Sequence, residues 1–92
     1  MIVSFKCRDT EAMFTGKRIG RFIGIEAVAM RKLALLNVAE KLEDLRVPPG
    51  NRLEALKGKR QGQWSIRIND KCRICFSFKG GGAVDVEIVD YH

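Results

Sequence analysis

Apolar and polar residues alternate along residues 2–6, and this period of two predicts a short first strand. A helix is expected next, with Asp9 or Thr10 as its N-cap and with its end at Gly16. Residues 17–22 combine basic side chains with glycine and are expected to form a loop. The first part of the chain is therefore predicted to be a strand, a helix and a loop.

A longer helix is predicted over residues 25–45, which contain no glycine or proline. The pair Pro48-Pro49 is expected to stop it. Apolar residues recur at helical spacing over a wide arc, formed by Val28, Leu35, Ala39 and Leu42 and widened by Ile25, Leu36 and Val38. A helix with so broad an apolar surface is expected to pack against a sheet, a second helix or a partner chain.

Two alternating segments on either side of residues 69–71 predict a β-hairpin. A two-residue turn would place Ile66 opposite Arg73 and would mix apolar and charged side chains on each face. A three-residue loop instead places Ile66 opposite Ile74 and Arg67 opposite Arg73, so that each face stays uniform. We therefore expect the three-residue loop. Two like charges directly opposite each other destabilise a sheet unless an anionic group lies near them.

A glycine-rich turn leads to a last alternating segment, residues 83–89. Val84, Val86 and Ile88 are expected to share one face of that strand. Three consecutive antiparallel strands after two helices define an α+β fold, a small twisted antiparallel β-sheet packed against two N-terminal α-helices. The whole chain of 92 residues (1–92) is expected to form a single domain.

The distribution of charge adds a class of partner to this fold. Residues 52–79 carry eight basic and two acidic side chains, whereas the rest of the chain carries nine of each, so the net charge of +6 lies in this segment. Such a field is typical of a protein that binds a polyanion, most often a nucleic acid. A merely basic exposed face and an acidic protein partner fit the same charge. The candidate RNA and phosphate contacts in this segment are Arg52, Lys59, Arg60, Arg67 and Lys71.

Other features of the chain narrow the class of protein. No apolar run approaches the roughly 18 residues of a membrane span, and the first residues lack the pattern of a secretory signal. We therefore expect a cytoplasmic protein that has no membrane partner. Its three cysteines are an odd number, which fits free thiols in a reducing compartment. Cys72 and Cys75 should point to opposite faces of a strand, and His92 is the only histidine, so neither a metal site nor another cofactor is expected.

The triplet Asp90-Tyr91-His92 carries the side chains best suited to proton transfer. Histidine titrates near neutral pH and can act as a general acid or base. The phenol of Tyr91 can stack on a nucleic-acid base and donate a proton, and Asp90 can orient either neighbour. The competing interpretation is a frayed and inactive chain end.

A second candidate element, residues 56–64, places Lys57, Lys59 and Arg60 among glycines, where they can hold phosphate oxygens. The spacing of a phosphate-binding P-loop is absent. RNA carries its own nucleophile, the 2′-hydroxyl. A small basic protein can therefore cleave RNA without metal by aligning that oxygen, moving protons and stabilising the charged transition state. The sequence thus favours RNA cleavage, with a larger partner that positions the RNA.

The chain resembles the HigB-type toxins of the RelE/ParE superfamily of bacterial toxin–antitoxin modules, and within them the GraT-like branch. The resemblance covers essentially the whole chain and is densest in LEDLRVPPGNRLEALKG (42–58), WSIRIND (64–70), RICF (73–76) and VEIVDYH (86–92). It implies a small antiparallel sheet with two N-terminal helices packed against it. It also implies a ribosome-dependent endoribonuclease that cuts mRNA in the ribosomal A site and is neutralised by a HigA-type helix-turn-helix antitoxin.

The resemblance also implies roles for individual residues. Lys57 and Arg73 correspond to cations that contact the phosphate or stabilise the transition state. Tyr91 and His92 correspond to the stacking and proton-transfer groups, with Asp90 in support. Any of these three is open as the general base, because coupled groups share their proton behaviour.

Three positions depart from the family pattern. Glu54 stands where some relatives carry histidine, which removes one possible proton carrier. Lys59 stands where an acid is common, and Cys72 where tryptophan is frequent. Two other functions stay open at this point: a gyrase poison similar to ParE, and a nucleic-acid-binding domain without catalysis.

Overall fold

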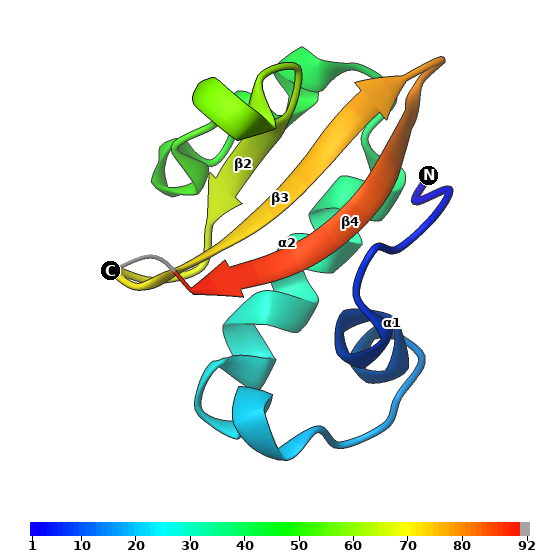
Figure 1. The fold of residues 1–92 in the computed structure, drawn as a ribbon, viewed down its shortest axis with the longest axis vertical. Helices are drawn as coiled ribbons and strands as arrows, with labels where there is room; N and C mark the ends of the chain where they lie inside the picture. Colours follow the sequence, from blue (N-terminus) through cyan, green and yellow to red (C-terminus); the bar gives the residue numbers. More distant parts are fainter. Residues whose placement is uncertain (91–92) are drawn as a thin grey trace.

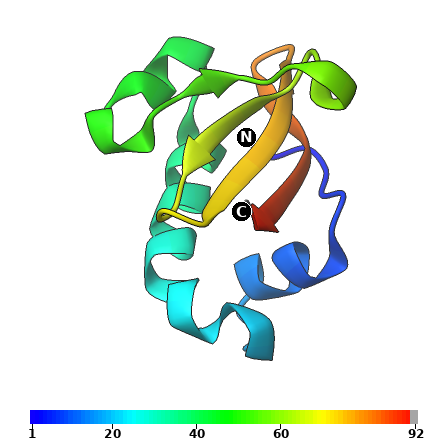
Figure 2. The same ribbon diagram turned by 60° about the vertical axis from the view of Figure 1, so that its left-hand side comes forward.

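The computed structural model describes residues 1–90, and Tyr91 and His92 lie outside the described residues. Two α-helices, α1 (Arg8–Phe14) and α2 (Glu26–Val38), precede a four-stranded antiparallel sheet with the strands in chain order, β1 (Glu54–Ala55), β2 (Trp64–Arg67), β3 (Cys72–Lys79) and β4 (Gly82–Asp90). Short 3₁₀ turns are formed by Gly20–Ile25, Leu42–Arg46, Pro49–Asn51 and Gly58–Arg60. The helices lie on one side of the sheet (Figures 1 and 2), which confirms the α+β prediction. Within residues 1–90, no helix is long and apolar enough to cross a membrane.

The register of the β2–β3 hairpin is the one predicted from the sequence. Ile66 pairs with Ile74, and Arg67 pairs with Arg73. The three-residue loop is closed by the carbonyl of Cys72, which accepts hydrogen bonds from Ile68 N (2.9 Å) and Asn69 N (3.2 Å). This register is favoured because a shift of one residue would move every apolar side chain of the strand to the other face.

The N-terminal segment is less regular than predicted. Residues 1–6 form two isolated parallel bridges with β4, Ile2 with Ala83 and Phe5 with Val86, instead of a continuous strand. Hydrogen bonds from Val3 N to Ala83 O (2.7 Å) and from Val86 N to Ser4 O (3.0 Å) fix the segment along the edge of β4. The prediction of a strand here was therefore wrong, although the segment does follow the sheet. A bulge in β4 interrupts the ladder between the two bridges.

That bulge also changes which residues of β4 point toward the helices. The register shifts between Cys75 and Ser77, and Asp85 adopts a left-handed backbone with φ of 55°. Val84 therefore pairs with Ser77, on the face away from Val86. The prediction that Val84 shares a face with Val86 was wrong because the extra residue reverses the alternation.

The boundaries of both helices differ from the predictions. Helix α1 begins at Arg8, and its N-cap is Cys7, whose side chain makes no capping hydrogen bond. Gly16 follows the helix with φ of 106°, so the predicted end is confirmed. At the start of α2, the 3₁₀ turn Gly20–Ile25 begins inside the predicted loop.

Helix α2 ends at Val38, well before the predicted end at residue 45. The carboxylate of Asp44 accepts hydrogen bonds from the backbone N–H groups of Glu40 (3.0 Å) and Lys41 (3.1 Å). Those two N–H groups are consequently not available to continue the helix, and residues 42–46 form a separate 3₁₀ turn. Local competition by an aspartate side chain is the physical reason for the early end.

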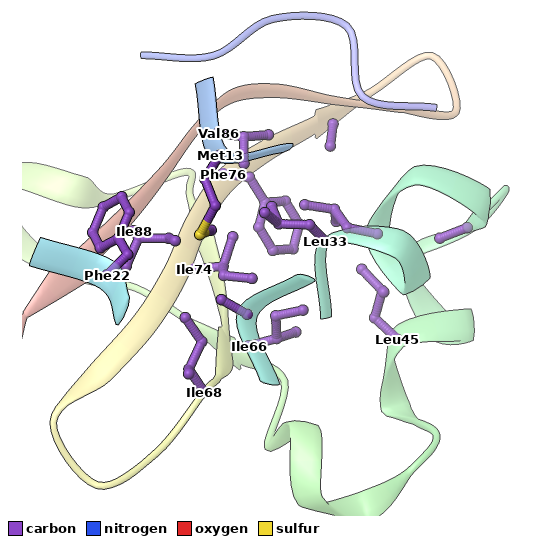
Figure 3. Packing of buried hydrophobic residues seen from close by; sticks show 14 residues of the cluster. Met13, Phe22, Leu33, Leu45, Ile66, Ile68, Ile74, Phe76, Val86 and Ile88 are labelled. Atoms are coloured by element: carbon purple, nitrogen blue, oxygen red, sulfur yellow. The ribbon is translucent and has the colours of Figure 1, made fainter. Parts of the chain in front are cut away.

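The hydrophobic core lies between α2 and the sheet (Figure 3). The buried face of α2 consists of Ala29, Leu33 and Leu36, spaced four and three residues apart. The predicted apolar stripe is rotated about the helix axis by roughly one residue position from this buried face. Val38, which was assigned to the stripe, is 72% exposed. The sheet contributes side chains that are fully buried, Ile66, Ile74, Phe76 and Val86. This core fixes β2 and β3, and with them the polar side chains on their other face.

Candidate functional site

The face of the sheet turned away from α1 and α2, which we call the outer face, is polar. Its central strands present Ser65 and Arg67 from β2 and Arg73 and Cys75 from β3, because these residues alternate with the core residues Ile66, Ile74 and Phe76. Glu87 of β4 lies opposite Cys75 and extends the same face. Basic and acidic side chains are thus placed on a rigid sheet rather than on a loop.

Arg73 is a cation of the outer face that is held by several polar contacts. Its Nε donates a hydrogen bond to Ser65 Oγ (2.7 Å), and its Nη2 donates one to the carbonyl oxygen of Arg52 (2.6 Å). The same Nη2 lies 3.8 Å from a carboxylate oxygen of Glu54, and the side chain is 13% exposed. The guanidinium is therefore fixed in one orientation, with partners on two of its three nitrogens.

The loop that supplies the Arg52 carbonyl is held in place by Asn51, whose side chain is completely buried. Asn51 Nδ2 donates to the carbonyls of Leu45 (3.1 Å) and Val47 (3.4 Å), and its Oδ1 accepts from Lys32 Nζ of α2. Arg52 itself has a left-handed backbone, with φ of 46°. These contacts determine where the carbonyl points, while the side chain of Arg52 is exposed.

Arg67 lies directly opposite Arg73, as predicted. The two like charges have separate partners, because Arg67 Nη2 is paired with Asp70 in the hairpin loop, whereas Arg73 is paired with Glu54. The anionic groups that this arrangement requires are thus supplied by the protein itself.

A second cation, Arg60, is bound to the outer face from the segment before β2. Its Nη1 lies 2.8 Å from Glu87 Oε1 and donates a further hydrogen bond to Gln63 Oε1 (3.0 Å). Lys57 and Lys59 lie on the same short segment, around the 3₁₀ turn Gly58–Arg60, and are exposed. The candidate cations of this segment are thus tethered to the outer face through Arg60.

The structure does not bring all predicted site residues together. Asp90 pairs with Cys72 at the end of the sheet, and both line a cavity of about 280 Å³ with Arg21, Phe22 and Ile88. This cavity is on the helix side, so Asp90 and Arg73 lie on opposite faces of the sheet. Lys71 is exposed in the hairpin loop, and the candidates Tyr91 and His92 lie outside the described residues.

The three cysteines have free thiols. Cys72 lies on the helix side and Cys75 on the outer face, as predicted for two residues three apart on a strand. Burial, together with the nearby charge of Asp90, raises the pKa of the Cys72 thiol. Within residues 1–90, no three His, Cys, Asp or Glu side chains gather where they could hold a metal ion.

Sequence reasoning missed the groups that hold the cations in place. Ser65 lies two residues before Arg67 in the predicted strand, so the sequence places both on the polar face. The contact of Ser65 with Arg73 could not be predicted from the sequence. Glu87 likewise belongs to the outward positions of the last strand. The Arg52 carbonyl left no sequence signal, because it depends on a left-handed backbone at a non-glycine residue.

A fixed guanidinium on a basic sheet face can bind phosphate oxygens and stabilise charge that develops on them. Together with the α+β fold, this face is typical of the class of small basic proteins that bind a polyanion. The comparisons with known proteins show the family. Residues 13–92 match the family model described as "RelE-like toxin of type II toxin-antitoxin system HigB". The chain belongs to this family of HigB-like toxins, and its partner is consequently an antitoxin.

Two relatives support this assignment. The toxin HigB-1 of Vibrio cholerae serotype O1 is 38% identical over 87 residues, which are 92% of this chain and 92% of that protein. A protein named endoribonuclease HigB, from Proteus vulgaris, is 44% identical over 41 residues, 45% of each chain.

A solved structure agrees in fold. The YoeB–YefM toxin–antitoxin complex of Staphylococcus aureus contains a chain that matches all of this chain and 98% of its own length, with a TM-score of 0.59 and 16% identity. At this identity the match shows the shared fold only.

Proposed function

We propose that the protein is an endoribonuclease that cleaves translated mRNA in the ribosomal A site. The observation that carries this proposal is the guanidinium of Arg73, held by Ser65 Oγ and the Arg52 carbonyl on the basic outer face. Membership of the HigB-like family and the name of the Proteus vulgaris relative support it. The resemblance in residues 42–58, 64–70, 73–76 and 86–92 favours the GraT-like branch and a HigA-type helix-turn-helix antitoxin. The free thiols favour a cytoplasmic location.

The proposed reaction uses the 2′-hydroxyl of the RNA. A general base removes the proton of this hydroxyl, and the oxygen attacks the adjacent phosphorus. The bond from phosphorus to the 5′-oxygen breaks, and that oxygen receives a proton from a general acid. The products are a 2′,3′-cyclic phosphate and a 5′-hydroxyl. The step needs no oxidant, reductant or third reactant.

We assign the stabilisation of the negatively charged transition state to Arg73 and Lys57. Cations that are already oriented before the reaction act most strongly, because no reorganisation is needed when charge develops. The contacts of Arg73 support this role, since its guanidinium is fixed by two hydrogen bonds. Exposed Lys57 would approach the RNA from the segment that Arg60 tethers to the outer face.

We assign base stacking and proton transfer to Tyr91 and His92, with Asp90 in a supporting role. The chemistry of a phenol and an imidazole supports this assignment. Glu54 is a carboxylate at 3.8 Å from Arg73, at the position where some relatives carry histidine. Its charge lies beside the Arg73 guanidinium, so we assign Glu54 to the positioning of Arg73 rather than to proton transfer.

The remaining cations, Arg52, Lys59, Arg60, Arg67 and Lys71, are proposed to contact phosphates on either side of the cleaved bond. Such contacts position RNA without reading its sequence. The ribosome would then supply the alignment that so small an open surface lacks.

The test is to map the 5′ ends of mRNA after adding the purified protein to translating ribosomes. Wild type should produce cuts at in-frame positions, whereas naked RNA should stay intact. Arg73→Ala and His92→Ala should each lower cleavage by about 100-fold or more. Lys79→Ala is the matched control, since Lys79 is a basic residue of β3 outside the candidate site, and it should retain cleavage.

Intact mRNA with the folded wild-type protein would contradict the proposal. Accumulation of cleaved DNA–gyrase complexes with intact mRNA would instead favour a gyrase poison. Unchanged growth inhibition by the Tyr91→Ala and His92→Ala variants would favour nucleic-acid binding without catalysis.

A further inference from the structure

The solvent-facing side of α2 is apolar as well as its buried side. The exposed residues Ala27, Arg31, Ala34 and Val38 recur every three to four positions, so they form one stripe along the helix, and three of the four are apolar. Val38 is 72% exposed. A surface helix normally carries charged and polar residues on this side, and a helix that is apolar all round is normally buried. This face of α2 therefore has the character of a contact surface.

The segment that follows α2 lies near the C-terminal end of the helix (Figure 2), and its residue Asn51 accepts a hydrogen bond from Lys32 of α2. Val47 is 70% exposed and precedes Pro48. Between this segment and the helix is a hollow of about 490 Å³, lined by Arg31, Lys32, Leu35 and Pro48. A shallow groove thus lies between one helix face and an extended segment, a shape that receives a helix from a partner.

The charges around this groove are positive. Neither Arg31 nor Lys32 forms an ion pair with any carboxylate of residues 1–90. Burial, and then the charges of Arg31 and Arg67, hold the pKa of Lys32 below its usual value. A carboxylate brought to this position would compensate the cations that now repel one another.

We propose that the hollow lined by Arg31, Lys32, Leu35 and Pro48 binds an acidic amphipathic helix of the antitoxin. The exposed side chains of Val38 and Val47, which follow Leu35 on α2 and precede Pro48 in the chain, extend its apolar surface, and we call these six residues the α2 groove. The apolar ridge of that helix would cover Leu35, Val38 and Val47, and its Asp or Glu side chains would pair with Arg31 and Lys32. The proposal follows from the type II toxin family rather than from the nuclease activity, so the two can fail separately.

Protein fits this groove better than RNA does. RNA is bound through stacking on aromatic side chains and through phosphate contacts, and the α2 groove contains aliphatic residues and no aromatic one. Exposed valines gain little from a phosphate backbone, whereas they are efficiently buried by an apolar helix ridge. Within residues 1–90, no hydrogen bond or ion pair joins the groove to Arg73, although Lys32 lies near enough to Arg67 of the outer face to be affected by its charge.

The test compares binding and cleavage in matched variants. The dissociation constant for a purified HigA-type antitoxin that binds the wild-type toxin is measured by titration calorimetry for Val38→Asp, Arg31→Glu and the double variant. Each single change should raise the dissociation constant by about 30-fold or more, as at other central interface positions. Ile23→Asp is the control, since Ile23 is also an exposed apolar residue, at 52%, but lies outside the groove. It should change binding by less than about threefold.

The melting temperature and ribosome-dependent cleavage are measured on the same variants and should stay at wild-type values. If Val38→Asp does not fold, Val38→Ser with Val47→Ser replaces it, with an expected rise of about tenfold in the dissociation constant. Antitoxin binding that is unchanged in the folded groove variants would overturn the proposal. So would wild-type antitoxin binding combined with loss of ribosome-dependent cleavage, which would assign the groove to RNA or the ribosome.

Discussion

Arg73 Nε donates a hydrogen bond of 2.7 Å to the hydroxyl of Ser65, a buried residue of the neighbouring strand. Within residues 1–90, Ser65 is the residue of β2 that forms a hydrogen bond with this guanidinium. The other two partners, Arg52 and Glu54, precede β2 in the chain. The small hydroxyl thus connects the core-fixed hairpin with the cation that we assign to the transition state.

Replacing Ser65 by alanine should reduce cleavage while the fold persists. A hydrogen bond to a charged group contributes about 1.5–3 kcal/mol, so if it orients Arg73 in the transition state the turnover rate should fall about 10- to 100-fold. The rate is measured under saturating ribosome-bound mRNA, with the melting temperature as the structural readout. Ser77→Ala, on the same face of β3, should keep the wild-type rate. Equal losses in both variants would argue against a specific role for Ser65.

Arg52 allows its backbone and side-chain roles to be separated. Its carbonyl binds Arg73, and its φ of 46° is a conformation that glycine adopts at little cost. Arg52→Gly should therefore preserve the fold and the position of Arg73 but lose one phosphate contact, so the salt dependence of RNA binding should decrease by about one counterion. Arg52→Ala should lose the same contact yet melt at a lower temperature than Arg52→Gly, because alanine, like arginine, is strained at a positive φ and glycine is not. A salt dependence identical to wild type would remove the Arg52 side chain from the RNA contacts.

The Arg60–Glu87 pair should contribute to stability as a unit. Both side chains are partly buried, at 31% and 15% exposure. Removing either partner removes the charged hydrogen bond of 2.8 Å between them, and we expect each alanine variant to lose about 1–3 kcal/mol in the free energy of unfolding. The double variant should lose clearly less than the sum of the two. Denaturant unfolding of the four proteins measures this coupling, and strict additivity would show that the pair is not coupled.

The turn after α2 should make stability depend on pH at the acid end. The backbone N–H groups of Lys41 and Glu40 hold the pKa of Asp44 below its usual value. A depressed folded-state pKa means that the contribution of this carboxylate is present above the unfolded value of about 4 and is lost as the pH falls through the lower folded value. Melting curves of wild type and Asp44→Ala should therefore differ at pH 6 and converge toward pH 2.5. A difference that persists undiminished at pH 2.5 would assign the effect to packing rather than charge.

The predicted elements succeeded where side-chain alternation alone decides the structure. The Arg67–Arg73 register followed from keeping Ile66 and Ile74 on one face, a constraint that is visible in the sequence. The end of α2 could not be predicted in this way. It depends on the carboxylate of Asp44, six residues beyond the helix, which hydrogen-bonds to backbone groups that a longer helix would have used. The bulge at Asp85 was equally hidden, because nothing in the alternation of β4 marks it.

The candidate site was also predicted only in part. Cations such as Arg73 were found because charge clustering and alternation are local features. Their supports were not. The Arg52 carbonyl and Glu87 act through contacts between residues 21 and 27 positions apart, and the contact of Ser65 with Arg73 is diagonal across the hairpin, which the strand register alone does not specify. Asp90 was expected to support Tyr91 and His92, its neighbours in the chain. The side of the sheet on which it lies, the helix side opposite to Arg73, depends on the bulge in β4 and could not be predicted.

The irregular segment 1–6 has a consequence for how the toxin meets other proteins. It occupies the outer edge of β4 so closely that a side chain at Gly82 would lie 2.6 Å from a methyl group of Val3. An uncovered edge strand invites another chain to extend the sheet, which leads to domain swapping and aggregation. Between Ala83 and Val86 the segment uses the backbone groups that an added strand would need, so an antitoxin gains no access to this part of the edge by adding a strand. A fragment that starts after residue 6 should accordingly self-associate. Residues 1–6 thus protect the edge of β4 against pairing with other copies of the chain.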